Sequence, residues 1–285
     1  MLYYPYIDPV AISIPFPFIE KLQIRWYGLT YLIGFVATWW LGHKRLKQFN
    51  QPMNANQFDD FLFYGILGVI IGGRLGYTLF YQFSEFINNP LYIFYIWKGG
   101  MSFHGGLLGV LLVTGLFSYY HKIPLFAITD FLAPLTPIGL GMGRIGNFIN
   151  GELWGVPTEL PWGMRIPIFC KHFPEQCNGF TSGFFWSEPL HPSQLYEAIL
   201  EGLVLFILLW WFSKRQRPTM AVSGLFLIVY ATIRCVIELV RQPDAHLGYL
   251  AYGWVTMGQI LSLPMLIGGI ILLALAYWQR LYRMR

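Results

Sequence analysis

The amino-acid sequence predicts an all-α integral membrane protein, on two grounds. Only 12% of its 285 residues are charged, whereas 55% are hydrophobic and 19% are aromatic; in soluble domains roughly a quarter of the residues are charged. Several apolar runs also approach the ~20 residues that a helix needs to cross a bilayer. We therefore expect one membrane domain that spans residues 1–285 and contacts membrane lipid.

Seven apolar stretches are predicted to be transmembrane helices. They are approximately residues 24–42, 58–81, 103–120, 124–142, 194–212, 222–240 and 254–278. Basic clusters follow the first, third, fifth and seventh stretches, beginning at Lys44, Lys122, Lys214 and Arg280. Because lysine and arginine are enriched in cytoplasmic loops, we expect the N-terminus outside and the C-terminus in the cytoplasm.

The net charge of +5 is explained by these clusters. It could otherwise suggest a nucleic-acid partner, but the basic residues lie at the ends of apolar runs and form no extended basic face. The charge therefore indicates membrane orientation, and we expect no nucleic-acid binding.

Two connecting segments stand out. Residues 83–100 carry Asn-Asn-Pro and Gly-Gly breaks with many aromatic residues, which favours an interfacial arm. The loop of about 157–190 is predicted to form a small extracytoplasmic head, where a bond between Cys170 and Cys177 would persist if it forms. Free thiols are the alternative. No cysteine has the spacing of a metal site, and Cys235 is expected to pack within its helix.

Charged residues occur inside the predicted helices, where each costs about 2.5–3.5 kcal/mol on insertion scales. The sixth stretch carries a polar stripe with spacings of four, four and three, formed by Tyr230, Arg234, Glu238 and Arg241. Such spacing places these residues on one helical face, where Arg234 and Glu238 can pair. This pair could serve only to neutralise itself for insertion.

A second polar stripe lies on the fifth stretch, formed by His191, Gln194, Glu197 and Glu201. Two polar stripes in apolar helices imply a shared cavity, because charged groups at membrane depth face protein or water. Arg74 and Asp130 add charge to the second and fourth stretches. For Asp130 and Glu201, structural ion pairs between helices are the simpler interpretation.

Residues 141–155, GMGRIGNFINGELWG, combine five glycines with Arg144, Asn147, Asn150 and Glu152. At membrane depth or at its outer edge such a segment cannot face lipid, and non-helical backbone there must be buried or line a cavity. A glycine motif for helix packing would explain the glycines but not the polar residues. We therefore expect an anion-binding segment.

His104 begins the third stretch beside two glycines and is a titratable group of near-neutral intrinsic pKa. A lone histidine at an interface is more often structural, so the residue pattern alone leaves catalysis and structure open.

The sequence resembles the bacterial prolipoprotein diacylglyceryl transferases. The family signature Gly-Arg-x-Gly-Asn-Phe-x-Asn-x-Glu-Leu-x-Gly is present from Gly143 to Gly155. Five further matches are RWYGLTYLIGF at 25–35, FYGILGVIIGGRLGY at 63–77, GGMSFHGG at 99–106, HPSQLYEA at 191–198 and RxxxExxRQPD from Arg234 to Asp244. The resemblance covers nearly the whole chain except about 157–190.

The resemblance implies transfer of the diacylglyceryl group of phosphatidylglycerol to the lipobox cysteine of a preprolipoprotein. A thioether forms and glycerol phosphate leaves, which is the first step of lipoprotein maturation in the bacterial inner membrane. It implies no metal and no soluble cofactor. The partners expected are phosphatidylglycerol and signal peptides with a lipobox.

The resemblance and the residue chemistry together predict the site. Arg144 and Arg234 would bind the leaving phosphate, because an arginine fork contacts phosphate bidentately. His104 would take the proton of the thiol, which is mostly protonated near neutral pH. Glu152 and Glu238 would hold the arginines. The predicted substrate-binding residues are Tyr27, Arg74, Asn147, Glu152, Gly155, Glu197, Tyr230, Glu238 and Arg241; Arg25, Arg74 and Arg241 could instead only balance charge.

Two other classes of protein remain possible from the residue patterns. A transporter also places charges and broken helices at the membrane midplane, but related halves such as inverted repeats are not evident here. A scaffold without chemistry gives little reason for a histidine together with paired arginines.

Overall fold

The computed structural model describes residues 2–16, 19–48, 51–95, 99–170, 182–243 and 248–283. The chain divides into two compact units, the first comprising Met1–Thr38 and Ala133–Arg285 and the second Trp39–Leu132. Helix α1 (Trp26–Leu46) contributes to both units. A single membrane domain over residues 1–285 stays a prediction.

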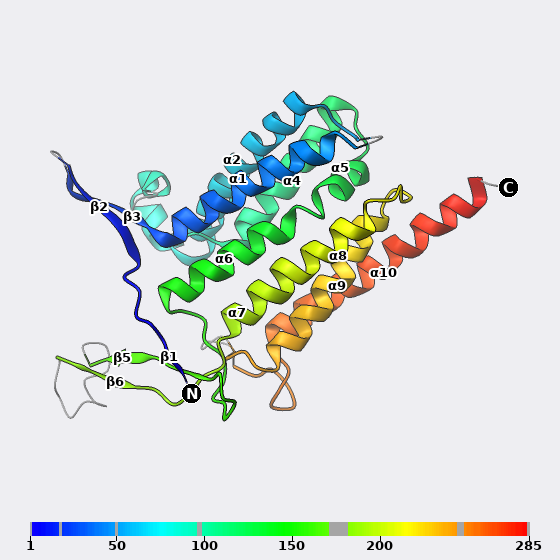
Figure 1. The fold of residues 1–285 in the computed structure, drawn as a ribbon. Coiled ribbons are helices and arrows are strands. Elements are labelled where there is room, and N and C mark those ends of the chain that lie inside the picture. The colour runs from blue at the N-terminus through cyan, green and yellow to red at the C-terminus, as the bar shows by residue number, and fades with distance from the viewer. Residues whose placement is uncertain are drawn as a thin grey trace. The chain divides into compact units, whose positions relative to one another are not determined.

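Helices dominate both units (Figure 1). Besides α1 they are α2 (Ala55–Tyr81), α3 (Phe83–Asn88), η1 (Pro90–Phe94), α4 (Phe103–His121), α5 (Leu125–Leu132), α6 (Thr136–Asn150), α7 (Ser193–Glu197), the π-helical η4 (Ala198–Val204), α8 (Leu205–Phe212), α9 (Ala221–Glu238) and α10 (Met257–Arg283). The strands are β1 (Leu2–Tyr3), β2 (Val10–Phe16), β3 (Ile19–Arg25), β4 (Met164–Arg165), β5 (Pro167–Phe169) and β6 (Phe184–Trp186).

Five helical segments of the described chain are long and apolar enough to cross a membrane. They are Ala55–Tyr81, Phe103–His121, Ser193–Phe212, Ala221–Glu238 and Met257–Tyr282. The consecutive helices α5 and α6 pass the same test together, as one broken span or a re-entrant loop. Only 17–39% of the residues in the five apolar windows are buried, so the remaining apolar surface needs a lipid environment. The protein is therefore a multi-pass membrane protein, whereas seven spans and their orientation stay predictions.

Close helix packing depends on glycines in both units. In the second unit, a Cβ on Gly72 would lie 2.3 Å from the carbonyl oxygen of Gly105, and a Cβ on Gly109 would lie 2.0 Å from that of Gly68. In the first unit, Gly224 of α9 faces the backbone of α10 in the same way. Small residues let helix backbones approach closely where apolar burial cannot drive association.

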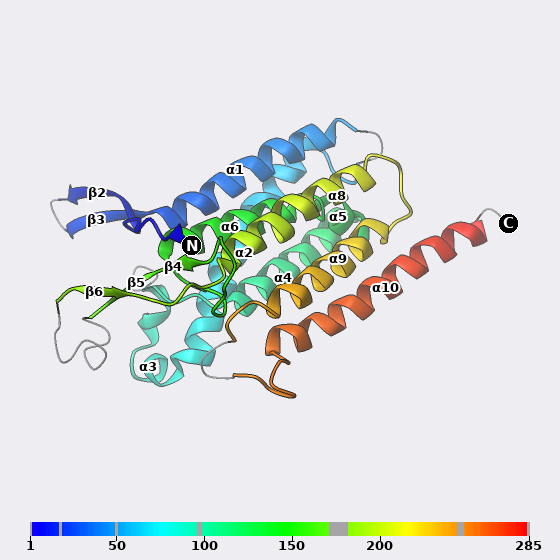
Figure 2. The same cartoon turned by 60° about the horizontal axis from the view of Figure 1, so that its bottom comes forward.

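Three two-stranded sheets accompany the helices in the described part of the chain, which is mostly helical as predicted. Strands β2 and β3 form an antiparallel hairpin that leads into α1 (Figure 1 and Figure 2). Strand β1 pairs in parallel with β4, and β5 pairs with β6 within the predicted head. Strands β1, β4, β5 and β6 have only two or three residues each, too few for an alternation of apolar and polar residues to be recognised in the sequence.

The predicted arm, residues 83–100, contains the short helices α3 and η1, and residues 96–98 lie outside the described chain. Cys170, in the head, forms a disulfide bond. Its expected partner Cys177 lies outside the described residues, so this pairing stays a prediction. Cys235 is a free cysteine of intermediate burial.

Candidate active site

The signature segment is helical for most of its length. Helix α6 continues through Asn150 and ends where Gly151 adopts a φ of +69°. The expected non-helical backbone is therefore confined to the last residues of the segment. A Cβ on Gly146 would lie 2.7 Å from Thr30 Oγ1 and 2.9 Å from a ring carbon of Tyr27 on α1, so this glycine serves helix packing.

The turn after α6 is organised around Glu152. Its carboxylate accepts hydrogen bonds from the amide groups of Asn147 and Asn150, at 2.8 and 3.3 Å. Its carbonyl oxygen accepts one from Gln194, which is fully buried on α7. No ion pair joins Glu152 to an arginine among the described residues, and its carboxylate contacts the two asparagines instead. Leu153 has a φ of +62°, a conformation that costs a non-glycine residue about 1–2 kcal/mol.

Gly155 joins three chain segments at one end of the first unit. Its N–H donates to the carbonyl oxygen of His191, at 2.9 Å, and it forms a bridge with Arg241. A Cβ at this position would lie 2.3 Å from the carbonyl oxygen of Val240. Only glycine fits at this position. Its contacts hold the turn after α6 against Val240 and Arg241, which lie just after α9.

Glu197 is the centre of a network of ion pairs. Its carboxylate lies 3.2 Å from Nη1 of Arg144 on α6, 2.6 Å from Nη1 of Arg234 on α9 and 3.6 Å from Nη1 of Arg241. One carboxylate thus connects Arg144 with two arginines that lie 90 and 97 positions further along the sequence. The two polar stripes identified in the sequence thus meet in this network, and the shared cavity stays a prediction.

Two further glutamates complete the network. Glu201 lies 3.4 Å from Arg144 and 3.9 Å from Arg234. Glu238 pairs with Arg234 one turn before it and lies 3.6 Å from Arg241. Glu201 sits in the π-helical η4, a conformation that is rare and frequent at functional sites.

The network is neutral in formal charge and asymmetric in exposure. Its three arginines cancel its three glutamates. The glutamate side chains are 0–4% exposed, whereas the arginine side chains are 12–18% exposed. The carboxylates are therefore more deeply buried than the arginine side chains that pair with them.

The two tyrosines of the predicted site lie on helices that line the network. Tyr230 precedes Arg234 by one turn of α9 and stacks on Phe226, with ring centroids 5.8 Å apart. Tyr27 lies on α1, where its hydroxyl is 3.2 Å from that of Tyr31. Asn147 of α6 is buried, with its amide bonded to Glu152 as described above.

His104 and Arg74 belong to the second unit, so they are described apart from the network. His104 is the second residue of α4 and its side chain is exposed. The N–H of Ser102, the N-cap residue of α4, donates to the carbonyl oxygen of Gly73 at 2.9 Å.

Arg74 is 3% exposed, and its partners among the described residues are backbone oxygens. Its Nε bonds to Ile93, its Nη2 to Tyr92 and its Nη1 to Gly99 and Gly100, at 2.6–3.3 Å. Its guanidinium also lies over the Tyr92 ring, 4.7 Å from the centroid. Arg74 therefore fastens the arm to α2, which favours a structural role over substrate contact.

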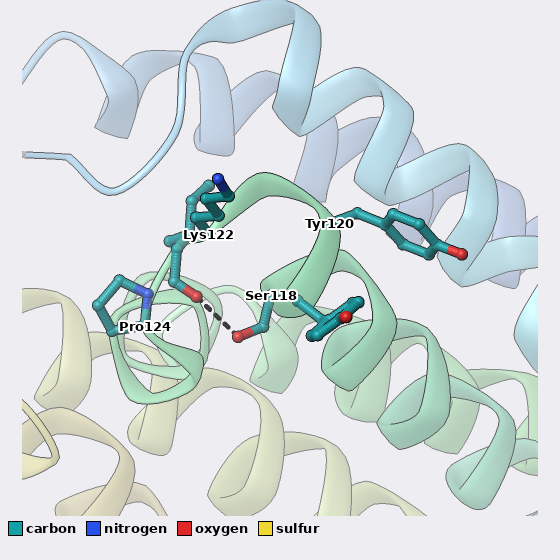
Figure 3. A pocket seen from close by; sticks show the side chains of 6 residues that line it. Ser118, Tyr120, Lys122 and Pro124 are labelled. Atoms are coloured by element: carbon teal, nitrogen blue, oxygen red, sulfur yellow. Dashed lines mark hydrogen bonds between the residues drawn. The ribbon is translucent and has the colours of Figure 1, made fainter.

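A shallow hollow lies at the connection between α4 and α5 (Figure 3). It is lined by Ser118, Tyr119, Tyr120, Lys122, Ile123 and Pro124, and it contains none of the predicted site residues. No group of three metal-ligating side chains is arranged for a metal ion in the described part of the chain.

The fold and the network define a class: a multi-pass helical membrane protein with cationic side chains held at a buried polar site. The family model described as prolipoprotein diacylglyceryl transferase matches residues 9–275. Similar proteins named phosphatidylglycerol–prolipoprotein diacylglyceryl transferase occur in Methylococcus capsulatus, 53% identical, and in Pseudomonas fluorescens, 51% identical. These alignments cover 97–98% of this chain and 96–99% of the relatives.

The chain belongs to the prolipoprotein diacylglyceryl transferase family. It is therefore a transferase, and the transporter and scaffold interpretations are set aside. The resemblance stated from the sequence motifs is confirmed.

Proposed function

We propose that this protein transfers the diacylglyceryl group of phosphatidylglycerol to the lipobox cysteine of a preprolipoprotein. A carbon–sulfur bond forms, and the carbon–oxygen bond to the phosphate breaks. Glycerol phosphate leaves with the electron pair. Family membership and the names of the similar proteins support this reaction.

The site assignment rests on one observation: Arg144, Arg234 and Arg241 form ion pairs with buried glutamates. Negative charge develops on the leaving phosphate, and hydrogen-bond donors already in place stabilise it without reorganisation. Arg144 and Arg234 supply planar forks from different helices, and their shared partner Glu197 is fully buried. In this proposal Arg241 and Asn147 line the same site for the leaving phosphate.

The acceptor thiol must lose a proton to become nucleophilic. Its unperturbed pKa is about 8.5, so most of it is protonated near neutral pH. We assign His104 as the general base, because its exposed side chain at the start of α4 is free to meet a substrate. The proton passes from sulfur to the imidazole as the thioether forms.

The same proposal includes the membrane arrangement. Helix α1 is the first of seven spans, α5 and α6 together form the fourth, and the protein lies in the bacterial inner membrane. The basic residues after the odd-numbered spans support an outer N-terminus and a cytoplasmic C-terminus. The head at about 157–190 then faces the compartment where secreted lipoproteins arrive.

Purified protein mixed with labelled phosphatidylglycerol and a lipobox peptide tests the reaction. We expect label to enter the peptide as a thioether and a matched peptide with cysteine replaced by serine to stay unlabelled. Equal labelling of both peptides, or labelling of neither by a folded protein, would contradict the proposed reaction.

A further inference from the structure

Glu238, the last residue of α9, uses both carboxylate oxygens. Its Oε1 pairs with Arg234 and lies 3.6 Å from Nη1 of Arg241. Its Oε2 accepts a hydrogen bond of 2.6 Å from the hydroxyl of Thr256, and this bond is buried. The orientation of one carboxylate thus sets the place of two arginines.

Thr256 immediately precedes α10 and also caps it. Its Oγ1 accepts from the N–H of Gln259 at 3.3 Å, while its own N–H donates to Oε1 of Gln259 at 3.1 Å. This is the reciprocal capping box of a helix N-terminus. A hydroxyl has one hydrogen and two acceptor sites, so Thr256 can cap the helix and donate to Glu238 at once.

Gly258 lets the first turn of α10 approach the carboxylate. A Cβ at this position would lie 2.5 Å from Oε1 of Glu238 and 2.6 Å from its Cδ. The partial positive charge of a helix N-terminus favours a carboxylate at this distance. Glu238 is therefore enclosed by α10 on one side and two arginines on the other.

We propose that Thr256 and Gly258 are positioning residues for diacylglyceryl transfer. They hold the Glu238 carboxylate in one orientation, and Glu238 in turn holds the Arg234 and Arg241 guanidinium groups toward the substrate. Neither residue touches the reacting atoms. This inference rests on the proposed role of the arginines.

The physical reason is the precision that a preorganised site needs. Misplacement of a catalytic group by about 1 Å can cost about 10²-fold in rate. Without the Thr256 hydroxyl, the Glu238 carboxylate is free to rotate and carry the Arg234 fork with it. Glu197 would still bind Arg234, so the charge stays in place while its orientation is lost.

Thr256→Val tests this step, because valine keeps the shape and removes the hydroxyl. We expect kcat for transfer to fall by about 10-fold, within the range that small displacements produce, with little change in KM for the peptide. Thr256→Ser should restore kcat. Gln259→Ala is the matched control, since it breaks the capping box but leaves the Thr256–Glu238 bond.

Melting temperature in detergent separates capping from positioning. Equal losses of kcat and melting temperature in Thr256→Val and Gln259→Ala would overturn the proposal, because helix capping alone would explain them. Gly258→Ala keeps the hydroxyl and crowds the carboxylate, so a similar fall in kcat is expected. Wild-type kcat in Gly258→Ala would also overturn it.

Combination with Arg234→Lys distinguishes this inference from the function on which it rests. If Arg234→Lys slows transfer to a rate that is still measurable and Thr256→Val adds nothing further in that background, both proposals stand. Full activity in Arg234→Lys would contradict the proposed site itself. Loss in Arg234→Lys with wild-type kcat in Thr256→Val would contradict only the positioning role.

Discussion

At the scale of single residues, each member of the ion-pair network contributes to folding as well as to the site. Removing one partner of a buried ion pair leaves an uncompensated charge and destabilises by about 3–5 kcal/mol. Glu197 contacts three arginines, so its removal would disturb all of them. Replacements that keep the charge therefore separate catalysis from folding better than alanine does.

His104 carries a prediction of its own. If its imidazole takes the thiol proton, His104→Gln should lower transfer by about 10²–10⁴-fold at neutral pH, the usual contribution of a positioned base. Transfer by the variant should recover partly as pH approaches about 8.5, because more of the cysteine is then thiolate. Transfer rates against pH for both proteins measure this.

Binding of phosphatidylglycerol by the His104→Gln protein is the accompanying control. Normal binding with slow, pH-rescued transfer supports a base. A structural histidine predicts lost folding or lipid binding without rescue, and near-normal transfer at neutral pH would assign the base elsewhere.

Sequence spacing predicted only part of the network. The Arg234–Glu238 pair follows from helical spacing and is confirmed. The contacts of Arg144 with Glu197 and Glu201 join distant segments, so no local pattern could predict them. The capping residue Thr256 was missed, although Thr256 and Gln259 have capping-box spacing, because its contact with Glu238 arises only from packing.

At the scale of elements, helices were predicted better than strands. Residues near each of the seven apolar stretches are helical, since a span of about 20 apolar residues is a strong signal. The hairpin of β2 and β3 was missed although Val10, Ile12 and Ile14 alternate along β2. Strands of this kind have the same composition as aromatic-rich loops and interfacial helices, so composition alone does not distinguish them.

The arm gives a prediction at this scale. In Arg74→Lys an ammonium group keeps the charge but cannot reproduce a planar fork that bonds to four carbonyl oxygens. Buried acceptors left unpaired cost about 1–3 kcal/mol each. We expect faster amide hydrogen exchange in residues 90–95 and 99–102, measured by mass spectrometry.

The same substitution at exposed Arg215 is the matched control and should leave exchange in the arm unchanged. If Arg74→Lys exchanges like the wild type throughout these residues, the carbonyl contacts do not hold the arm in place.

At the scale of the whole molecule, the proposed orientation in the membrane predicts which loops an impermeant reagent can reach. With seven spans and an outer N-terminus, Ser182→Cys in the head should react with an impermeant maleimide in intact cells. Gln216→Cys, between α8 and α9, should react only after lysis. The unsubstituted protein controls for its own cysteines, and the reverse labelling pattern would contradict the orientation.

The central claim is that the Arg144 and Arg234 forks bind the departing phosphate, and the transfer rate of their lysine variants tests it most directly. Lysine keeps the charge but loses bidentate geometry. We predict that Arg144→Lys and Arg234→Lys each fold normally and transfer about 10²–10³-fold more slowly, the usual effect of removing one donor to a developing anion. Wild-type transfer rates in both folded variants would contradict the claim.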